Sequence, residues 1–225
     1  MPARRSRRAY AVSLAAALVG WSFVAPRLPA AWRVAAQSAV GGALVVGTRA
    51  PLGLGPPRLW AGLRLGSAVA FSAASTVAAT TLVPPVRQSM AVREPPASVP
   101  DWLLVRIPVG TVWSEESAFR AALATVGSAA FGRRGGRLLQ ATAFGLSHIP
   151  DARATGEPVA ATVLVTGLGG WIFGWLADRT GSLAAPMLAH LAINEAGAIA
   201  VLAMRSGVDR VVTQLPAPHE IDRQG

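Results

Sequence analysis

Long apolar stretches alternate with short polar or proline-containing segments along most of the chain. A helix that spans a bilayer needs about 17 to 25 mostly apolar residues. On that criterion the pattern predicts about seven spans, with six or eight as alternatives, at residues 9–25, 31–48, 60–83, 102–130, 138–150, 157–177 and 183–204. We therefore expect an all-α fold, a polytopic transmembrane helical bundle.

Two of these spans are irregular. The span at 138–150 is short, and the one at 102–130 is overlong. Pro108 and Gly110 lie within the long span, and proline interrupts the backbone hydrogen bonding of a helix. We expect the long span to break near these two residues into an entry piece and a core helix.

A proline-rich segment divides the chain. Residues 84–101 contain several prolines and no apolar periodicity, which predicts a non-helical loop. It separates an N-terminal block of three spans, residues 1–83, from a core of about four spans, residues 102–204. Residues 205–225 have mixed charge and no long apolar run, so we expect an exposed C-terminal tail.

Composition agrees with a membrane protein, since 52% of the 225 residues are hydrophobic and 14% are charged. The net charge of +10 comes from arginines scattered between apolar runs, so it indicates membrane topology and no nucleic-acid partner. Four arginines precede the first span, which favours a cytoplasmic N-terminus and a first helix that is retained rather than cleaved as a signal peptide. The chain has no cysteine, which excludes disulfides and a thiol nucleophile.

Three polar clusters interrupt the apolar stretches of the core, and the first contains Glu115, Glu116 and Arg120. Adjacent residues on a helix point about 100° apart, so the two carboxylates serve different purposes. Arg120 follows Glu116 by four residues, the spacing of side chains that pair on one helix face, so we expect a structural ion pair. Glu115 is then the freer carboxylate. A partly desolvated carboxylate is suited to accept a proton from water, which makes Glu115 the candidate general base.

The other two clusters supply imidazoles and an amide. Phe144 and His148 are four residues apart, as are His190 and Asn194, so each pair shares a helix face. Ser147 adjoins His148, but neighbouring helical residues point in different directions, so we do not expect a Ser-His hydrolytic pair. Histidine, asparagine and serine side chains also form hydrogen bonds between membrane helices without any catalytic role. Ionisable groups at membrane depth are costly unless they face one another or a wet cavity, so three clusters indicate one buried site.

The motifs EESAFR from Glu115, FGLSH from Phe144 and HLAIN from His190 follow one another in this order. Together they resemble the CPBP family of intramembrane endopeptidases, which includes the CAAX prenyl proteases and the bacterial Abi proteins. The family pattern is a double glutamate with arginine four residues after the second, then phenylalanine with histidine four later, then histidine with asparagine four later. All three parts match, and the resemblance covers about half of the chain.

The resemblance implies a helical bundle around a wet conical cavity. Glu115 and His148 would activate a water for attack on a peptide bond, and His190 and Asn194 would stabilise the oxyanion. Phe119 and Phe144 would support the site. The resemblance favours a route without a metal or other cofactor. Zinc stays the alternative, because Glu115, His148 and His190 are ligand types that zinc accepts.

The implied substrate is a membrane protein or a lipidated peptide within the lipid bilayer. Arginine-only cation usage and abundant alanine, glycine and valine are typical of a GC-rich bacterial genome, so we expect an integral protein of a bacterial plasma membrane. One alternative is a non-proteolytic immunity or scaffold protein that retains the buried polar network. A proton-coupled transporter would also use glutamate and histidine, but inverted repeats are not evident.

Overall fold

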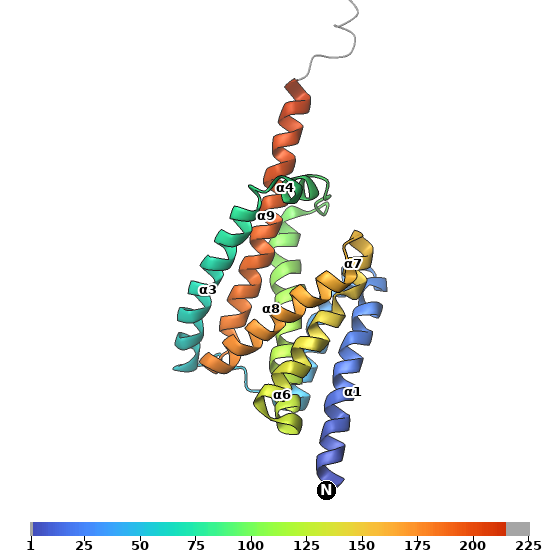
Figure 1. Cartoon of the computed structure of the whole chain (residues 1–225), viewed down its shortest axis with the longest axis vertical. Coiled ribbons are helices and arrows are strands. Elements are labelled where there is room, and N and C mark those ends of the chain that lie inside the picture. The colour runs from blue at the N-terminus through green and yellow to red at the C-terminus, as the bar shows by residue number, and fades with distance from the viewer. Residues whose placement is uncertain (1, 215–225) are drawn as a thin grey trace, which may run out of the picture.

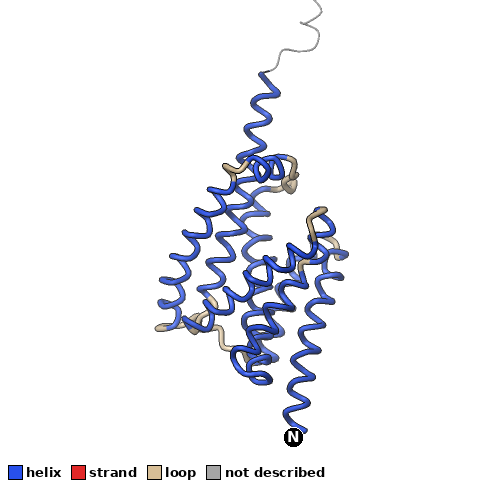
Figure 2. Tube along the Cα trace, in the orientation of Figure 1, coloured by secondary structure: helices blue, strands red, loops and turns tan. Residues whose placement is uncertain are grey.

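The computed structural model describes residues 2–214, and within this range the chain forms helices and loops without a strand (Figures 1 and 2). The prediction of an all-α fold is confirmed. In chain order the elements are α1 (Pro2–Val24), η1 (Ala25–Arg27), α2 (Ala30–Thr48), α3 (Arg58–Thr80), α4 (Pro84–Ala91), α5 (Val99–Asp101), η2 (Trp102–Trp113), η3 (Glu116–Leu123), α6 (Ala124–Ser147), α7 (Ile149–Thr155), α8 (Val159–Thr180) and α9 (Ala184–Gln214).

Each predicted span overlaps a helix, but the number of membrane crossings is a separate matter. By length and apolar composition, three helices in the described range qualify as spans: Arg4–Arg27, Val159–Thr180 and Ala184–Ser206. The pair α3 and α4, bent by 93°, qualifies together as a fourth. The count of about seven therefore stays a prediction. The helix that carries Glu115 and Glu116 is less apolar because it also holds Arg106 and Arg120.

Small residues bring the helices of the bundle close together. α3 packs along α9, and α6 packs against both α1 and α8 (Figure 1). A Cβ atom added at Gly66 would lie 2.8 Å from the Cα of Ala185, and one added at Gly145 would lie 2.5 Å from the carbonyl oxygen of Val163. Close backbone approach at glycine is a common way to pack membrane helices, where the hydrophobic effect contributes little.

The prediction that residues 84–101 are entirely non-helical was wrong. The short helix α4 begins at Pro84 and ends at Ala91, and it bends sharply away from α3. Pro84 and Pro85 occupy the first turn of α4, where a helix needs no backbone N–H donor. The residues between α4 and α5 form the loop that the prolines indicated.

The expected break near Pro108 and Gly110 was also wrong. Residues Trp102–Trp113 form the continuous π-helix η2 with Pro108 inside it. The non-helical residue lies after this span, at Gly132 within α6, with a φ of 76° and a ψ of 167°. α6 is therefore a hairpin of two helical segments. This turn separates the predicted spans 102–130 and 138–150 close to where the sequence placed their boundary.

The last helix is longer than predicted. α9 continues to Gln214, ten residues beyond the predicted end of the span at 204. The part of the predicted tail at 205–214 is thus helical, and its remainder at 215–225 lies outside the described residues.

Candidate active site

Glu115 lies between two π-helical segments, η2 and η3, and Glu116 is the first residue of η3 on the same continuous helical stretch. π-helical turns are rare and occur frequently at functional sites. α2 supports this stretch from one side, since a Cβ added at Gly41 would lie 3.0 Å from the carbonyl oxygen of Ser114. The backbone that carries Glu115 is therefore held tightly against α2.

Glu116 is at the centre of a buried ion-pair cluster. Its Oε1 atom lies 3.2 Å from Arg120 Nη1, and both side chains are fully buried. The same oxygen accepts a hydrogen bond of 2.8 Å from Nδ1 of His190 on α9. The pairing predicted between Glu116 and Arg120 is present, and His190 joins it.

Aromatic rings enclose this cluster. The guanidinium of Arg120 lies 3.7 Å from the ring centroid of Phe144 and 5.0 Å from that of Phe173, distances typical of cation–π contacts. Phe119 packs edge-on against Phe144 at 5.2 Å between centroids. The ring of Phe173 also lies 5.2 Å from that of His190. Phe119 and Phe144 thus contact the charged side chains or each other, in the place expected of supporting residues.

Glu115 is arranged differently from its neighbour. Its side chain is 28% exposed, and its Oε2 atom lies 3.8 Å from Nε2 of His190. That distance is too long for a hydrogen bond. His190 thus stands between the two carboxylates, with Nδ1 bound to Glu116 and Nε2 toward Glu115. Glu115 is the glutamate left accessible to a water or a substrate.

His148 caps the C-terminal end of α6, and its Nδ1 atom lies 2.8 Å from the carbonyl oxygen of Phe144. A carbonyl oxygen only accepts hydrogen bonds, so Nδ1 carries a hydrogen and Nε2 is the free ring nitrogen. The chain turns at His148, and Pro150 lies in the first turn of α7.

Ser147 lies closer to His148 than predicted, with its Oγ atom 3.4 Å from Nδ1. That nitrogen is the donor to Phe144, and the Ser147 hydroxyl donates to the same carbonyl oxygen at 2.8 Å. The imidazole therefore has no free acceptor directed at Ser147.

We expect Ser147→Ala to keep peptidase activity within about twofold of wild type, because it removes a hydroxyl that bonds only locally. The measurement is the initial rate of cleavage of one substrate. A loss of two or more orders of magnitude would instead indicate a nucleophilic serine.

Asn194 lies one turn beyond His190 on α9, as predicted. Its Nδ2 atom donates a hydrogen bond of 3.0 Å to the carbonyl oxygen of His190. An asparagine amide has two N–H donors, so one hydrogen bond leaves a second donor for another acceptor.

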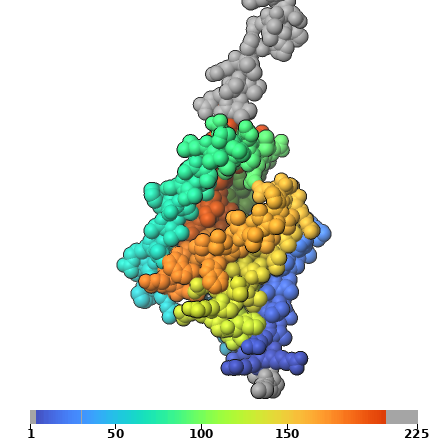
Figure 3. Space-filling model, in the orientation of Figure 1, coloured from blue at the N-terminus to red at the C-terminus, as the bar shows by residue number. Residues whose placement is uncertain are grey.

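One cavity of about 480 Å³ joins the four residues predicted to be catalytic, since Glu115, His148, His190 and Asn194 all line it. Its wall also includes Arg33 from α2. The cavity lies toward the end of the bundle that carries α4 and α7, opposite the N-terminus (Figure 1). The surface is hollowed between these two helices, with α9 visible behind them (Figure 3). The site is therefore accessible from one end of the bundle.

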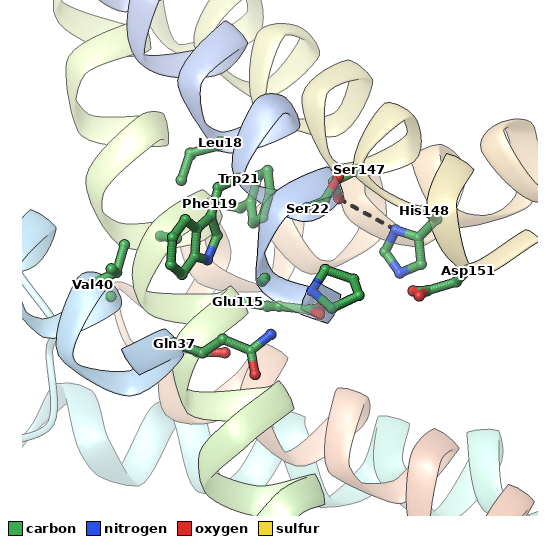
Figure 4. Close-up of a pocket in the computed structure, with 15 residues that line it drawn as sticks. Leu18, Trp21, Ser22, Gln37, Val40, Glu115, Phe119, Ser147, His148 and Asp151 are labelled. Carbon is green, nitrogen blue, oxygen red and sulfur yellow. Dashed lines mark hydrogen bonds between the residues drawn. The ribbon is translucent and has the colours of Figure 1, made fainter. Parts of the chain in front are cut away.

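A smaller cavity of about 100 Å³ adjoins it and shares Glu115 and His148 (Figure 4). α1 and α2 form much of its wall through Leu18, Trp21 and Gln37. The N-terminal block thus supplies part of both cavities.

Three further residues near the site were missed by sequence reasoning. Gln37 lines both cavities, and Asp151 lies beside the His148 ring (Figure 4). Phe173 contacts both Arg120 and His190. Asp151 follows His148 by three residues and so carried a local signal. Gln37 and Phe173 belong to other helices, and no spacing within one sequence motif connects them to the site.

The residues named for zinc do not fit a metal site. Among the described residues, no group of three or more histidine, cysteine or carboxylate side chains is arranged to hold a metal ion. Glu115, His148 and His190 share the cavity without forming such a group. His190 also has Nδ1 committed to Glu116.

Paired acidic and imidazole groups around a cavity that opens at one end of an apolar helical bundle are typical of a membrane protein with a polar site. Residues 97–196 match the family model described as "Type II CAAX prenyl endopeptidase Rce1-like". The match contains all three motifs, and residues 97–196 are similar to this family of CAAX-type proteases, as the motifs predicted. Searches of curated proteins and of solved structures found no match. Peptidase activity is supported at the level of the family.

Proposed function

We propose that the chain is an intramembrane endopeptidase that hydrolyses a peptide bond of a membrane-associated substrate with an activated water. The observation that carries this proposal is the common cavity of Glu115, His148, His190 and Asn194. Hydrolysis needs a base for the water, donors for the developing oxyanion and a proton for the leaving amine. The four side chains supply all three functions.

Glu115 acts as the general base in this proposal. Its carboxylate is accessible from the cavity, whereas Glu116 is fully buried and bound to Arg120 and His190. Glu115 takes one proton from the water as the water oxygen bonds to the peptide carbonyl carbon. Glu116 and Arg120 are positioning residues, because they hold His190 and do not line the cavity.

His148 and Glu115 act on the same attacking water in this proposal. Because His148 Nδ1 donates to Phe144, Nε2 is the nitrogen that accepts a hydrogen bond from the water or passes a proton on. When the tetrahedral intermediate collapses, the carbon–nitrogen bond breaks. The proton taken by Glu115 then passes to the leaving amine, so protons balance over the reaction.

His190 and Asn194 form the oxyanion site in this proposal. His190 Nε2 faces Glu115 and donates to the oxyanion when the imidazole carries its second proton. The second N–H of the Asn194 amide supplies another donor. Donors fixed in place before the reaction stabilise a developing negative charge strongly in a water-poor site.

The match to the CAAX-type endopeptidase model supports a substrate class. We propose a membrane protein or a lipidated peptide, reached within the bilayer of a bacterial plasma membrane. A cytoplasmic N-terminus places the cavity end of the bundle on the opposite side of the membrane (Figure 1).

The test compares protein termini in membranes that contain equal amounts of wild type, Glu115→Gln or Glu195→Gln. Glu195 is a carboxylate on the same helix as His190 that does not line the cavity. We expect new termini with wild type and Glu195→Gln but not with Glu115→Gln, and a chelator arm tests metal dependence. Identical termini in all samples would contradict the proposal and favour the immunity or scaffold protein.

A further inference from the structure

A second polar cavity lies at the opposite end of the bundle from the active site. It has a volume of about 450 Å³ and lies where α3 and α9 begin and α8 ends. Its wall contains the three arginines Arg58, Arg120 and Arg133 and the carboxylate Asp178. The hydroxyl-bearing residues Thr125, Ser128 and Ser182 also line it. Arginine guanidinium groups and hydroxyls are the donors with which proteins bind phosphate groups.

The rim of this cavity is built from segments that hold one another in place. The backbone N–H of Leu183 donates a hydrogen bond of 2.8 Å to the carbonyl oxygen of Leu52, which ties the loop before α3 to the turn before α9. Gly181 has a φ of 65°, and a Cβ added there would lie 3.4 Å from Cδ of Arg58. The side chain of Arg58 therefore packs over this glycine at the edge of the cavity.

The charge at this end of the bundle is almost entirely positive. The four segments that meet there contain ten arginines and one carboxylate, at residues 2–8, 49–58, 128–137 and 177–183. That carboxylate, Asp178, is bound by Arg137 through Nε at 3.0 Å and Nη2 at 2.5 Å. Among the described residues, Arg58 and Arg133 have no carboxylate partner. Their charges are available to a bound anion.

A further arginine-lined cavity adjoins the same hairpin turn. Arg4, Arg7 and Arg8 of α1 line it together with Phe131 and Gly132, and its volume is about 370 Å³. The guanidinium of Arg8 lies 5.6 Å from the ring centroid of Phe131. The tip of the α6 hairpin is thus bordered by arginine-lined cavities on two sides.

The position of these cavities indicates which class of anion binds there. They lie at the ends of the apolar helices α1, α3, α8 and α9, the depth at which lipid headgroups meet a membrane protein. The exposed ring of Trp60, two residues after Arg58, is typical of that interface. The N-termini of α3 and α9 add partial positive charge near the cavity, and the C-terminus of α8 adds partial negative charge. We propose that the cavity lined by Arg58, Arg133, Thr125, Ser128 and Ser182 binds the phosphate of an anionic phospholipid headgroup.

The test measures lipid binding to the purified full chain in neutral detergent by native mass spectrometry, with phosphatidylglycerol and phosphatidylcholine as probes. A double variant, Arg58→Ala with Arg133→Ala, is compared with Arg87→Ala with Arg153→Ala, which removes two exposed arginines of α4 and α7 at the other end. We expect the first double variant to lose roughly fivefold in phosphatidylglycerol affinity per arginine. The control double variant and phosphatidylcholine binding should change little.

A second double variant keeps the charge and removes two of the three hydroxyls. Thr125→Val with Ser128→Ala should also weaken phosphatidylglycerol binding, which separates a site in the cavity from a general attraction of the arginine-rich surface. Unchanged binding in this variant, or equal losses in the two arginine double variants, would overturn the proposal. Competition by inorganic phosphate at the concentration of lipid phosphate would overturn the assignment to a lipid. Melting curves without lipid confirm that each variant is folded.

This proposal is independent of the peptidase proposal, because binding is measured without a peptide substrate. The Glu115→Gln variant should bind phosphatidylglycerol as wild type does.

Discussion

Replacing Glu115 by glutamine is expected to slow peptide-bond hydrolysis by roughly two to four orders of magnitude, the usual contribution of a general base. Glutamine keeps the size and one carbonyl oxygen of the side chain but cannot accept the proton of the water. Glu115 is partly exposed and forms no hydrogen bond with His190 at 3.8 Å, so the substitution leaves the buried cluster in place. The purified variant should therefore unfold at the wild-type temperature.

The measurement is the initial rate of cleavage of a substrate identified from the mapped termini. Glu195→Gln is the matched control and should keep the wild-type rate. His148→Gln should also lower the rate, and the double variant should lose little more than the slower single variant, because both residues act on one water. A Glu115→Gln enzyme with more than about a tenth of the wild-type rate would contradict the assignment of the base.

The helices were predictable because an apolar run long enough to cross a bilayer is a strong signal for a helix. Each predicted span overlaps a helix, and the predicted spans 102–130 and 138–150 leave a gap that contains the turn of the α6 hairpin. Two of the errors came from proline. Pro84 begins a helix, and Pro108 lies inside the π-helix η2, because the effect of proline depends on which backbone donors a helix needs at that position. That requirement is set by local geometry and not by residue type.

The site was predictable where two residues share a helix face. The spacing from Glu116 to Arg120 predicted their ion pair, and the same reasoning left Glu115 as the freer carboxylate. Contacts between different helices were not predictable in this way. The hydrogen bond from His190 to Glu116 joins residues 74 apart, and Gln37 reaches the cavity from α2. Only the packing of the bundle brings these residues together.

Replacing Arg120 by methionine is expected to lower the free energy of unfolding by about 3–5 kcal/mol, the cost of leaving one partner of a buried ion pair without the other. Methionine retains apolar contact with Phe144, whose ring lies 3.7 Å from the guanidinium, so the loss reports mainly on charge. Equilibrium unfolding in detergent measures this change in the free energy of unfolding. Arg137→Met is the matched control, because the pair of Arg137 with Asp178 is partly exposed and should contribute no more than about 1 kcal/mol.

The double variant Arg120→Met with Glu116→Gln separates the charge from the packing. Glutamine removes the carboxylate that Arg120→Met leaves unpaired, so the double variant should be more stable than the single variant Arg120→Met. Equal stability of Arg120→Met and Arg137→Met would contradict a stabilising role of the buried pair. If both predictions hold, the two glutamates have different roles. Loss of the Glu115 carboxylate reduces the rate of hydrolysis at unchanged stability, whereas loss of Arg120, the partner of Glu116, reduces stability. Adjacent side chains on one helix can have such separate effects because they point about 100° apart, one to the cavity and one into the bundle.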